Sequence, residues 1–157
     1  MGLNREYIGR TWRSAEVYEV SREKIRDYAM ATGEPHPAYV DVRAARALGH
    51  PDVVAPPTFA TVLWARMNTW PLREPDIGRS PKPNMVIGDE RITHHRTIHA
   101  GDRLVFATRV NDIRDLGGKH ELLEVVHTIT TEDGEPVCTM TDMAISRGTA
   151  VGAEGAR

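Results

Sequence analysis

The sequence is short of cysteine, of long apolar runs and of clustered positive charge, and each shortage excludes a class of protein. Cys138 is the single cysteine among 157 residues, so no internal disulfide can form, which fits the reducing cytoplasm. No run approaches the roughly 18 apolar residues that a membrane-spanning helix needs. The charged N-terminus also lacks the apolar region of a signal peptide. We therefore expect a cytoplasmic protein that does not contact a membrane.

The charge balance gives no indication of a nucleic-acid partner. The formal net charge is −2, from 20 Lys and Arg against 22 Asp and Glu, and the basic residues are spread along the chain without forming a stripe. A length of 157 with 40% hydrophobic residues fits one globular domain. We place this domain at residues 1–147, followed by a small, polar, disordered tail at 148–157.

The first part of the chain shows helical periodicity with recognisable helix ends. Ser21 is suited to cap a helix that runs to Ala31, and Gly33 follows as its terminator. Asp41 is suited to cap a second helix, which ends at Gly49. These signals predict two short amphipathic helices joined by a loop.

A third helix is predicted from Thr58 through Trp70, with apolar residues on nearly every side. A helix of this kind belongs in the interior of a protein, so we expect it to be the central element of the fold. The segment from Pro71 to Pro83 contains four prolines and predicts an excursion over the surface.

After this segment the apolar period changes from 3.6 to 2, which indicates strands. The alternation predicts strands at residues 90–99, 104–110, 123–129 and 137–145, and glycine-containing turns separate the later ones. Helices followed by a run of antiparallel strands favour an α+β fold, in which a curved antiparallel sheet wraps around the long central helix.

The loop at residues 33–41 (GEPHPAYVD) is the strongest candidate for a functional site. It places the acid Glu34, the imidazole His36 and the phenol Tyr39 on a frame of two prolines. Proline fixes φ and keeps such a loop rigid. Polar side chains on a rigid loop between helices point to a site rather than to a linker.

Seven histidines raise the question of a metal site, but their spacing argues against one. His94 and His95 are neighbours in a predicted strand and would point to opposite faces, while His95 and His99 would lie roughly 13 Å apart on one face. No metal site is therefore predicted. Cys138 has no cation nearby in sequence and is interpreted as a packing residue.

The same loop resembles the signature of MaoC-like (R)-specific enoyl-thioester hydratases and dehydratases, which reads roughly Gly-Asp-x-Asn-Pro-Ile/Leu-His-x-Asp. Two further segments are similar to this family, namely residues 55–59 (APPTF) and residues 98–104 (IHAGDRL). The resemblance covers most of the chain and implies the hotdog fold. The chain looks most like the accessory subunits of two-subunit (3R)-hydroxyacyl-carrier-protein dehydratases and the N-terminal half of double-hotdog hydratases.

The residues that the resemblance marks as catalytic are altered in this chain. Glu34 stands in place of the family's aspartate, and Tyr39 in place of its histidine. A phenol with an ordinary pKa of about 10 is a poor base near neutrality. His36 stands where the family has asparagine. Pro56 and Pro57 stand where the family has His-Gly, whose backbone N–H binds the thioester oxyanion, and proline has no N–H.

These departures imply an accessory chain whose MaoC-like partner carries the catalytic Asp and His. The resemblance implies that the complex dehydrates a (3R)-3-hydroxyacyl thioester of acyl carrier protein (ACP) or coenzyme A (CoA) in fatty-acid metabolism, without a metal or redox cofactor. The residues expected to contact the acyl group are Tyr39, Pro57, Thr58 and Phe59.

Two alternatives stay open from the sequence. The chain is either an autonomous hydratase that uses Glu34 and His36 as an acid–base pair, or a non-catalytic homodimer that binds acyl groups. The sequence does not decide the length of the acyl chain, or whether the thioester is carried by CoA or by ACP.

Overall fold

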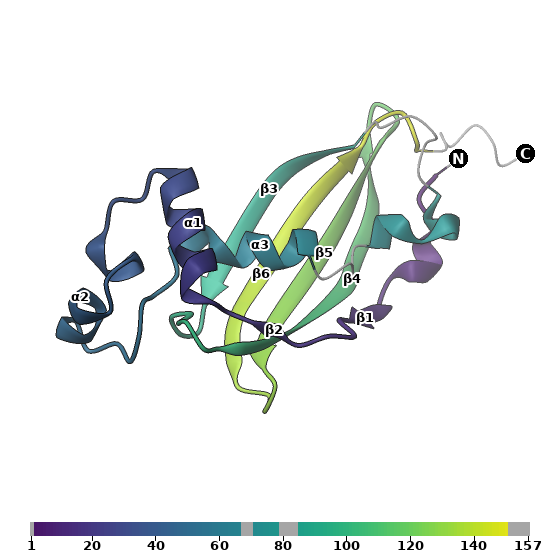
Figure 1. Cartoon of the computed structure of the whole chain (residues 1–157). Helices are drawn as coiled ribbons and strands as arrows, with labels where there is room; N and C mark the ends of the chain where they lie inside the picture. The colour runs from purple at the N-terminus through teal and green to yellow at the C-terminus, as the bar shows by residue number, and fades with distance from the viewer. Residues whose placement is uncertain (1, 67–70, 79–84, 151–157) are drawn as a thin grey trace, which may run out of the picture.

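The computed structural model describes residues 2–66, 71–78 and 85–150. Its largest element is one antiparallel sheet with the strand order β1-β4-β5-β6-β3, and β2 also pairs with β4. The strands are β1 (Thr11–Arg13), β2 (Tyr18–Glu19), β3 (Met85–His94), β4 (Arg103–Gly117), β5 (His120–Thr131) and β6 (Pro136–Ser146). Figure 1 shows the four long strands curving together, with helix α3 (Ala60–Arg66) lying across them. The expected α+β architecture is confirmed.

Two helices lie beside this core, where the sequence predicted them. Helix α1 (Arg22–Thr32) begins at Ser21, whose side chain accepts a hydrogen bond from the Lys24 N–H, and ends at the left-handed Gly33. Helix α2 (Val42–Ala47) begins at Asp41, which accepts from the Arg43 N–H. Among the residues described, no helix is both long enough and apolar enough to cross a membrane.

The central helix starts differently from the prediction. The prolines produce a 3₁₀ turn, η3 (Pro57–Phe59), before α3 begins at Ala60, because proline presets φ and has no N–H to donate. Phe59, Ala60 and Leu63 are fully buried against the sheet, as expected for a central helix. The described helix has 7 residues, and its predicted continuation to Trp70 lies outside the described residues.

The first predicted strand is displaced along the chain. It was expected at residues 90–99, but β3 covers Met85–His94. The backbone bends after His94, where the N–H groups of His95 and Arg96 both donate to the carbonyl of Val137. The alternation at residues 95–99 therefore belongs to a loop, and His95 and His99 do not share a strand.

A second core joins segments that gave no periodic signal. Leu3, Tyr7 and Ile77 are buried together against the half of the long strands nearest the β4–β5 hairpin, and the Asn4 N–H donates to the Ile77 carbonyl. The remaining buried members are Val110, Ile113, Leu123, Val125 and Ala144. Within the predicted surface excursion, residues 71–78 form two 3₁₀ turns, η4 (Pro71–Arg73) and η5 (Pro75–Ile77). Arg73, Pro75 and Asp76 are exposed as expected, whereas Ile77 is buried in this core. The isolated apolar residues of these segments are too few to show a period.

The end of the domain reaches slightly into the predicted tail. Thr149 is buried, its hydroxyl donates to Ser146, and the Ala150 N–H donates to the carbonyl of Lys119. The remainder of the predicted tail, residues 151–157, lies outside the described residues.

Candidate functional site

The loop at residues 33–41 is anchored by its backbone and by one small side chain. His36 begins the 3₁₀ turn η2 (Pro37–Tyr39), and its Nδ1 accepts a hydrogen bond of 3.2 Å from the Ala38 N–H. Ala38 is buried against Val54, whose N–H donates to the Ala38 carbonyl over 3.1 Å. These contacts connect the loop to the segment that leads into the central helix.

The polar side chains of this loop do not form an acid–base pair. The ring centroids of His36 and Tyr39 are 5.4 Å apart, and no hydrogen bond joins either ring to the Glu34 carboxylate, although all three residues are described. Burial, and then the nearby Glu34 charge, raise the pKa of Tyr39 above its ordinary value. Tyr39 therefore stays protonated near neutrality and can donate a hydrogen bond, but it is not a base.

Two of the residues expected at the acyl group, Thr58 and Phe59, contact Tyr28 of helix α1. The Tyr28 hydroxyl lies 3.0 Å from the Thr58 carbonyl oxygen and 3.0 Å from the Thr58 hydroxyl. Phe59 is fully buried and packs edge-on against the Tyr28 ring, with centroids 5.5 Å apart. Sequence reasoning counted Tyr28 only as part of an apolar stripe and missed its role in fixing the start of the central helix.

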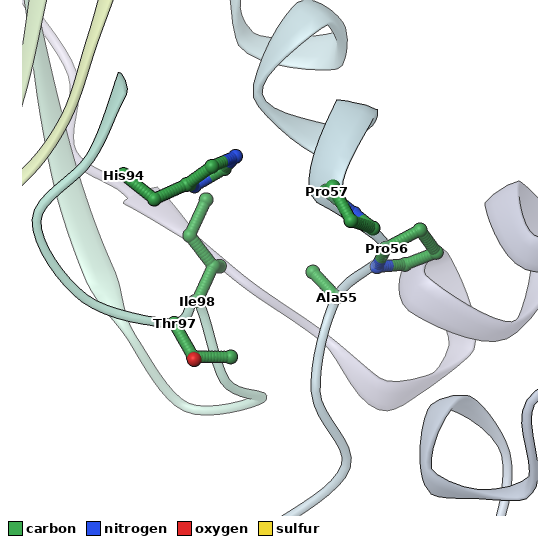
Figure 2. Close-up of a pocket in the computed structure, with 6 residues that line it drawn as sticks. All are labelled: Ala55, Pro56, Pro57, His94, Thr97 and Ile98. Atoms are coloured by element: carbon green, nitrogen blue, oxygen red, sulfur yellow. The ribbon is translucent and has the colours of Figure 1, made fainter. Parts of the chain in front are cut away.

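A pocket of about 210 Å³ lies where the chain enters the central helix. Figure 2 shows its two walls, one from the segment before α3 and one from the end of β3 and the loop after it. The residues that line it are Ala55, Pro56, Pro57, His94, Thr97 and Ile98. Of the predicted binding residues, only Pro57 lines this pocket. His94 and Thr97 were missed because the sequence placed them inside one continuous strand.

The wall formed by residues 95–99 is held in place by several polar contacts. The Arg96 guanidinium binds both carboxylate oxygens of Asp102, and the same carboxylate accepts from the His99 N–H over 2.9 Å. His50 Nδ1 and His99 Nε2 are 3.1 Å apart. Burial lowers the pKa of His99, against an opposing effect of the Asp102 charge.

A second polar cluster lies deep in the sheet, on the face covered by the central helix. We name Thr108, His127 and Asp142 the sheet triad. His127 is fully buried between the other two, with Nδ1 2.8 Å from the Thr108 hydroxyl and Nε2 3.0 Å from Asp142 Oδ2. Glu90 on β3 is the cross-strand partner of Asp142, and burial followed by the Asp142 charge raises the pKa of Glu90.

Metal chemistry finds no support in the arrangement of the described residues. They contain no group of three or more His, Cys, Asp and Glu side chains that could hold an ion. Cys138 is buried in the main core, and this burial raises the pKa of its thiol to about 11, so it is a packing residue as expected.

Comparison with known proteins agrees with this geometry. A family model described as the FAS1-like dehydratase domain region matches residues 6–140. A UPF0336 protein of Saccharopolyspora erythraea is 42% identical over 155 residues, which cover 99% of this chain and 98% of that protein. A third match is one chain of the C-terminally truncated HadBC complex, a (3R)-hydroxyacyl-ACP dehydratase from Mycobacterium tuberculosis. The two chains superpose with a TM-score of 0.79 and are 29% identical, over 88% of this chain and 96% of that one.

A second solved structure, described as a MaoC-like dehydratase, matches with a TM-score of 0.81 and 31% identity over 90% of this chain and 42% of its own. A curved antiparallel sheet around one helix, shared with these neighbours, defines a hotdog-fold protein of the MaoC-like dehydratase class. Within this class, the chain belongs to the FAS1-like dehydratase region family.

Proposed function

We propose that this chain is the accessory subunit of a (3R)-hydroxyacyl-thioester dehydratase and pairs with a MaoC-like catalytic chain. The reaction of the complex is the reversible loss of water from a 3-hydroxyacyl thioester. The catalytic acid and base come from the partner, and this chain completes the binding site for the acyl group.

The state of the signature loop carries this proposal. General acid–base catalysis requires a group that exchanges a proton near neutrality within hydrogen-bond reach of the substrate. Tyr39 is a protonated phenol, no hydrogen bond joins the Glu34 carboxylate to either ring of the loop, and His36 Nδ1 already accepts a backbone hydrogen bond. The loop keeps a rigid backbone but lacks an assembled acid–base pair, which disfavours autonomous catalysis by Glu34 and His36.

The free edge of β3 supports a partner of the same fold. Among the described strands, β3 pairs only with β6, so its outer edge offers unpaired backbone groups. Val86 and Ile87 lie on this strand and are 41% and 48% exposed, so the open edge also offers apolar side chains to a partner. The HadBC structure is itself described as a complex of dehydratase chains.

Co-expression with a MaoC-like chain that retains the Asp and His of the signature tests the proposal. We expect a stable heteromeric complex that removes the enone absorbance of an enoyl thioester, while this chain alone gives no turnover. Robust turnover by the isolated chain, abolished in Glu34→Ala or His36→Ala, would instead establish the autonomous hydratase. A stable homodimer that ignores the catalytic chain would favour the acyl-binding alternative.

The interface is tested by a matched pair of substitutions at equally exposed apolar residues. Ile87 lies on the free edge and is 48% exposed, whereas Leu116 lies at the hairpin between β4 and β5 and is 47% exposed. We expect Ile87→Lys to weaken the complex at least roughly tenfold, because a buried unpaired charge costs several kcal/mol, and Leu116→Lys to leave it unchanged. Equal effects of both variants would argue against pairing through β3.

A further inference from the structure

The pocket between residues 55–57 and residues 94–98 is preformed. The Ala55 N–H donates to the Ile98 carbonyl over 2.8 Å, and Val54 and His99 form an isolated bridge between the same two segments. The Arg96–Asp102 ion pair fixes the loop behind the second wall. Because both walls are tied together by backbone hydrogen bonds, a ligand entering this pocket need not reorganise it.

The wall on the helix side has no hydrogen-bond donor to offer. Pro56 and Pro57 have no N–H, and the N–H of Ala55 is already bonded to Ile98. This wall contributes only apolar ring and methyl surface. Any donor that a ligand meets must come from the opposite wall.

His94 supplies such a donor. It is the last residue of β3, and Figure 2 shows its ring pointing across the pocket toward Pro57. Among the described residues it has no hydrogen-bond partner, whereas the neighbouring His95 bonds the Thr139 hydroxyl at 2.9 Å. An imidazole carries an N–H in either protonation state, so His94 can donate into the pocket at any pH near neutrality.

The lining also carries no permanent charge. None of its six residues is lysine, arginine, aspartate or glutamate. The nearest arginine in sequence, Arg96, is committed to Asp102 through contacts of 2.8 and 3.0 Å. His94 and Pro57 are exposed at the mouth of the pocket, so a free carboxylate or phosphate would keep part of its hydration but would meet no permanent counter-charge. A neutral carbonyl flanked by methylene groups matches both the apolar walls and the two side-chain donors of the opposite wall, the His94 imidazole and the Thr97 hydroxyl.

We propose that this pocket binds a neutral carbonyl group of an acyl-pantetheine thioester, with the His94 imidazole donating a hydrogen bond to the carbonyl oxygen. The proposal rests on the dehydratase function proposed above and adds a specific contact made by this chain. Two carbonyl sources share the required chemistry, namely the thioester itself and the amides of the pantetheine arm. Ala55, Pro56, Pro57 and Ile98 pack against the flanking apolar atoms.

Small probes separate the two sources in the full-length chain. Ring signals of isotopically labelled histidines are followed by NMR during titration with three probes. S-ethyl thiobutyrate has a thioester and no amide, and pantetheine has amides and no thioester. Butyrate is the charged control. We expect a saturable shift of the His94 signal with one of the two neutral compounds and none with butyrate. The compound that binds identifies the carbonyl.

Two matched histidine variants test the hydrogen bond. His94→Phe keeps the ring shape but removes the N–H, and it should weaken binding of the active probe roughly three- to tenfold, as expected for a neutral hydrogen bond. His95→Phe changes the adjacent ring, which is bonded to Thr139, and should leave the affinity unchanged. Three results would overturn the proposal. They are equal probe affinity of His94→Phe and the unmodified chain, a His94 NMR signal that does not shift with any probe, and binding of butyrate as tight as that of the neutral probe.

The NMR titration of His94 and the co-expression experiment can fail separately. An active heteromeric complex in which His94 never responds to any probe would leave the accessory function standing and remove this pocket assignment. A responsive His94 in a chain that forms no complex would keep the pocket and remove the accessory role.

Discussion

The loop at residues 33–41 and the sheet triad carry similar side chains in opposite surroundings. Each region combines a carboxylate, an imidazole and a hydroxyl, but only the sheet triad connects them, with His127 within 3.0 Å of both partners. In the loop, His36 bonds a backbone N–H and the Glu34 carboxylate bonds neither ring. The chemistry of a residue set depends on how the fold orients and desolvates it, more than on which residues are present.

Burial explains the difference between the two regions. The sheet triad lies on three neighbouring strands, where the ladder holds the side chains at fixed spacings and excludes water. An unpaired polar group is costly there, so each side chain must find a partner. The loop side chains are partly or wholly exposed, and water can satisfy them individually.

The largest expected loss of stability follows from removing the imidazole of the sheet triad. In His127→Leu, the Asp142 carboxylate loses its partner at Oδ2, and Oδ1 already has no hydrogen-bond partner among the described residues. Removing one partner of a fully buried polar pair should lower the free energy of unfolding by about 3–5 kcal/mol. Urea denaturation measures this loss, and the double variant His127→Leu/Asp142→Leu should recover part of it. A loss below about 1 kcal/mol would show that the triad is not tightly coupled.

The second test restores the chemistry of the loop. The triple variant Glu34→Asp/Tyr39→His/Pro57→Gly shortens the carboxylate to the family's aspartate and restores an imidazole and a backbone N–H. It should hydrate an enoyl thioester roughly 100-fold faster than the uncatalysed background. The control Glu34→Asn/Tyr39→His/Pro57→Gly lacks the carboxylate and should stay inactive. No gain in the first variant would mean that the loop geometry, as well as the residues, has departed from an active one.

A smaller effect is expected from the loop imidazole. His36→Ala removes one acceptor from an exposed turn, and its bond to the Ala38 N–H is 3.2 Å long. The loss should be about 0.5–1 kcal/mol in the free energy of unfolding, because water replaces the acceptor. Urea denaturation beside His127→Leu gives the comparison directly. Equal losses in the two variants would remove the distinction between the two regions.

The smallest expected effect concerns pH and the loop that carries His99. Burial lowers the pKa of His99 in the folded state below the free value of 6.5, so folding favours the neutral ring. The stability gained in this way is complete above pH 6.5 and is lost as the pH falls below it. The midpoint of urea denaturation should therefore fall between about pH 7 and about pH 5, and less steeply in His99→Asn. If the urea midpoint of His99→Asn changes with pH as steeply as that of the unmodified chain, the pH dependence comes from other groups.

Local signals predicted much of the fold and part of the site. Ser21 and Asp41 were identified as helix caps from side chain and position alone, because a capping hydrogen bond spans only two or three residues. Pro57 was expected at the acyl group from the family resemblance, and it lines the pocket before the central helix. The strand at Met85–His94 was misplaced, because the bend after it depends on Val137, more than 40 positions away.

The sequence by itself determined the helix ends, the hairpin turns, the α+β class and the altered signature loop, since each depends on neighbouring residues. Only the tertiary structure decided the rest. It brought Leu3 and Ile77 into one core, placed Thr108, His127 and Asp142 in contact across three strands, and set His94 opposite Pro57. Contacts between distant residues form because packing and desolvation make them favourable together, and no local pattern in the chain records that choice.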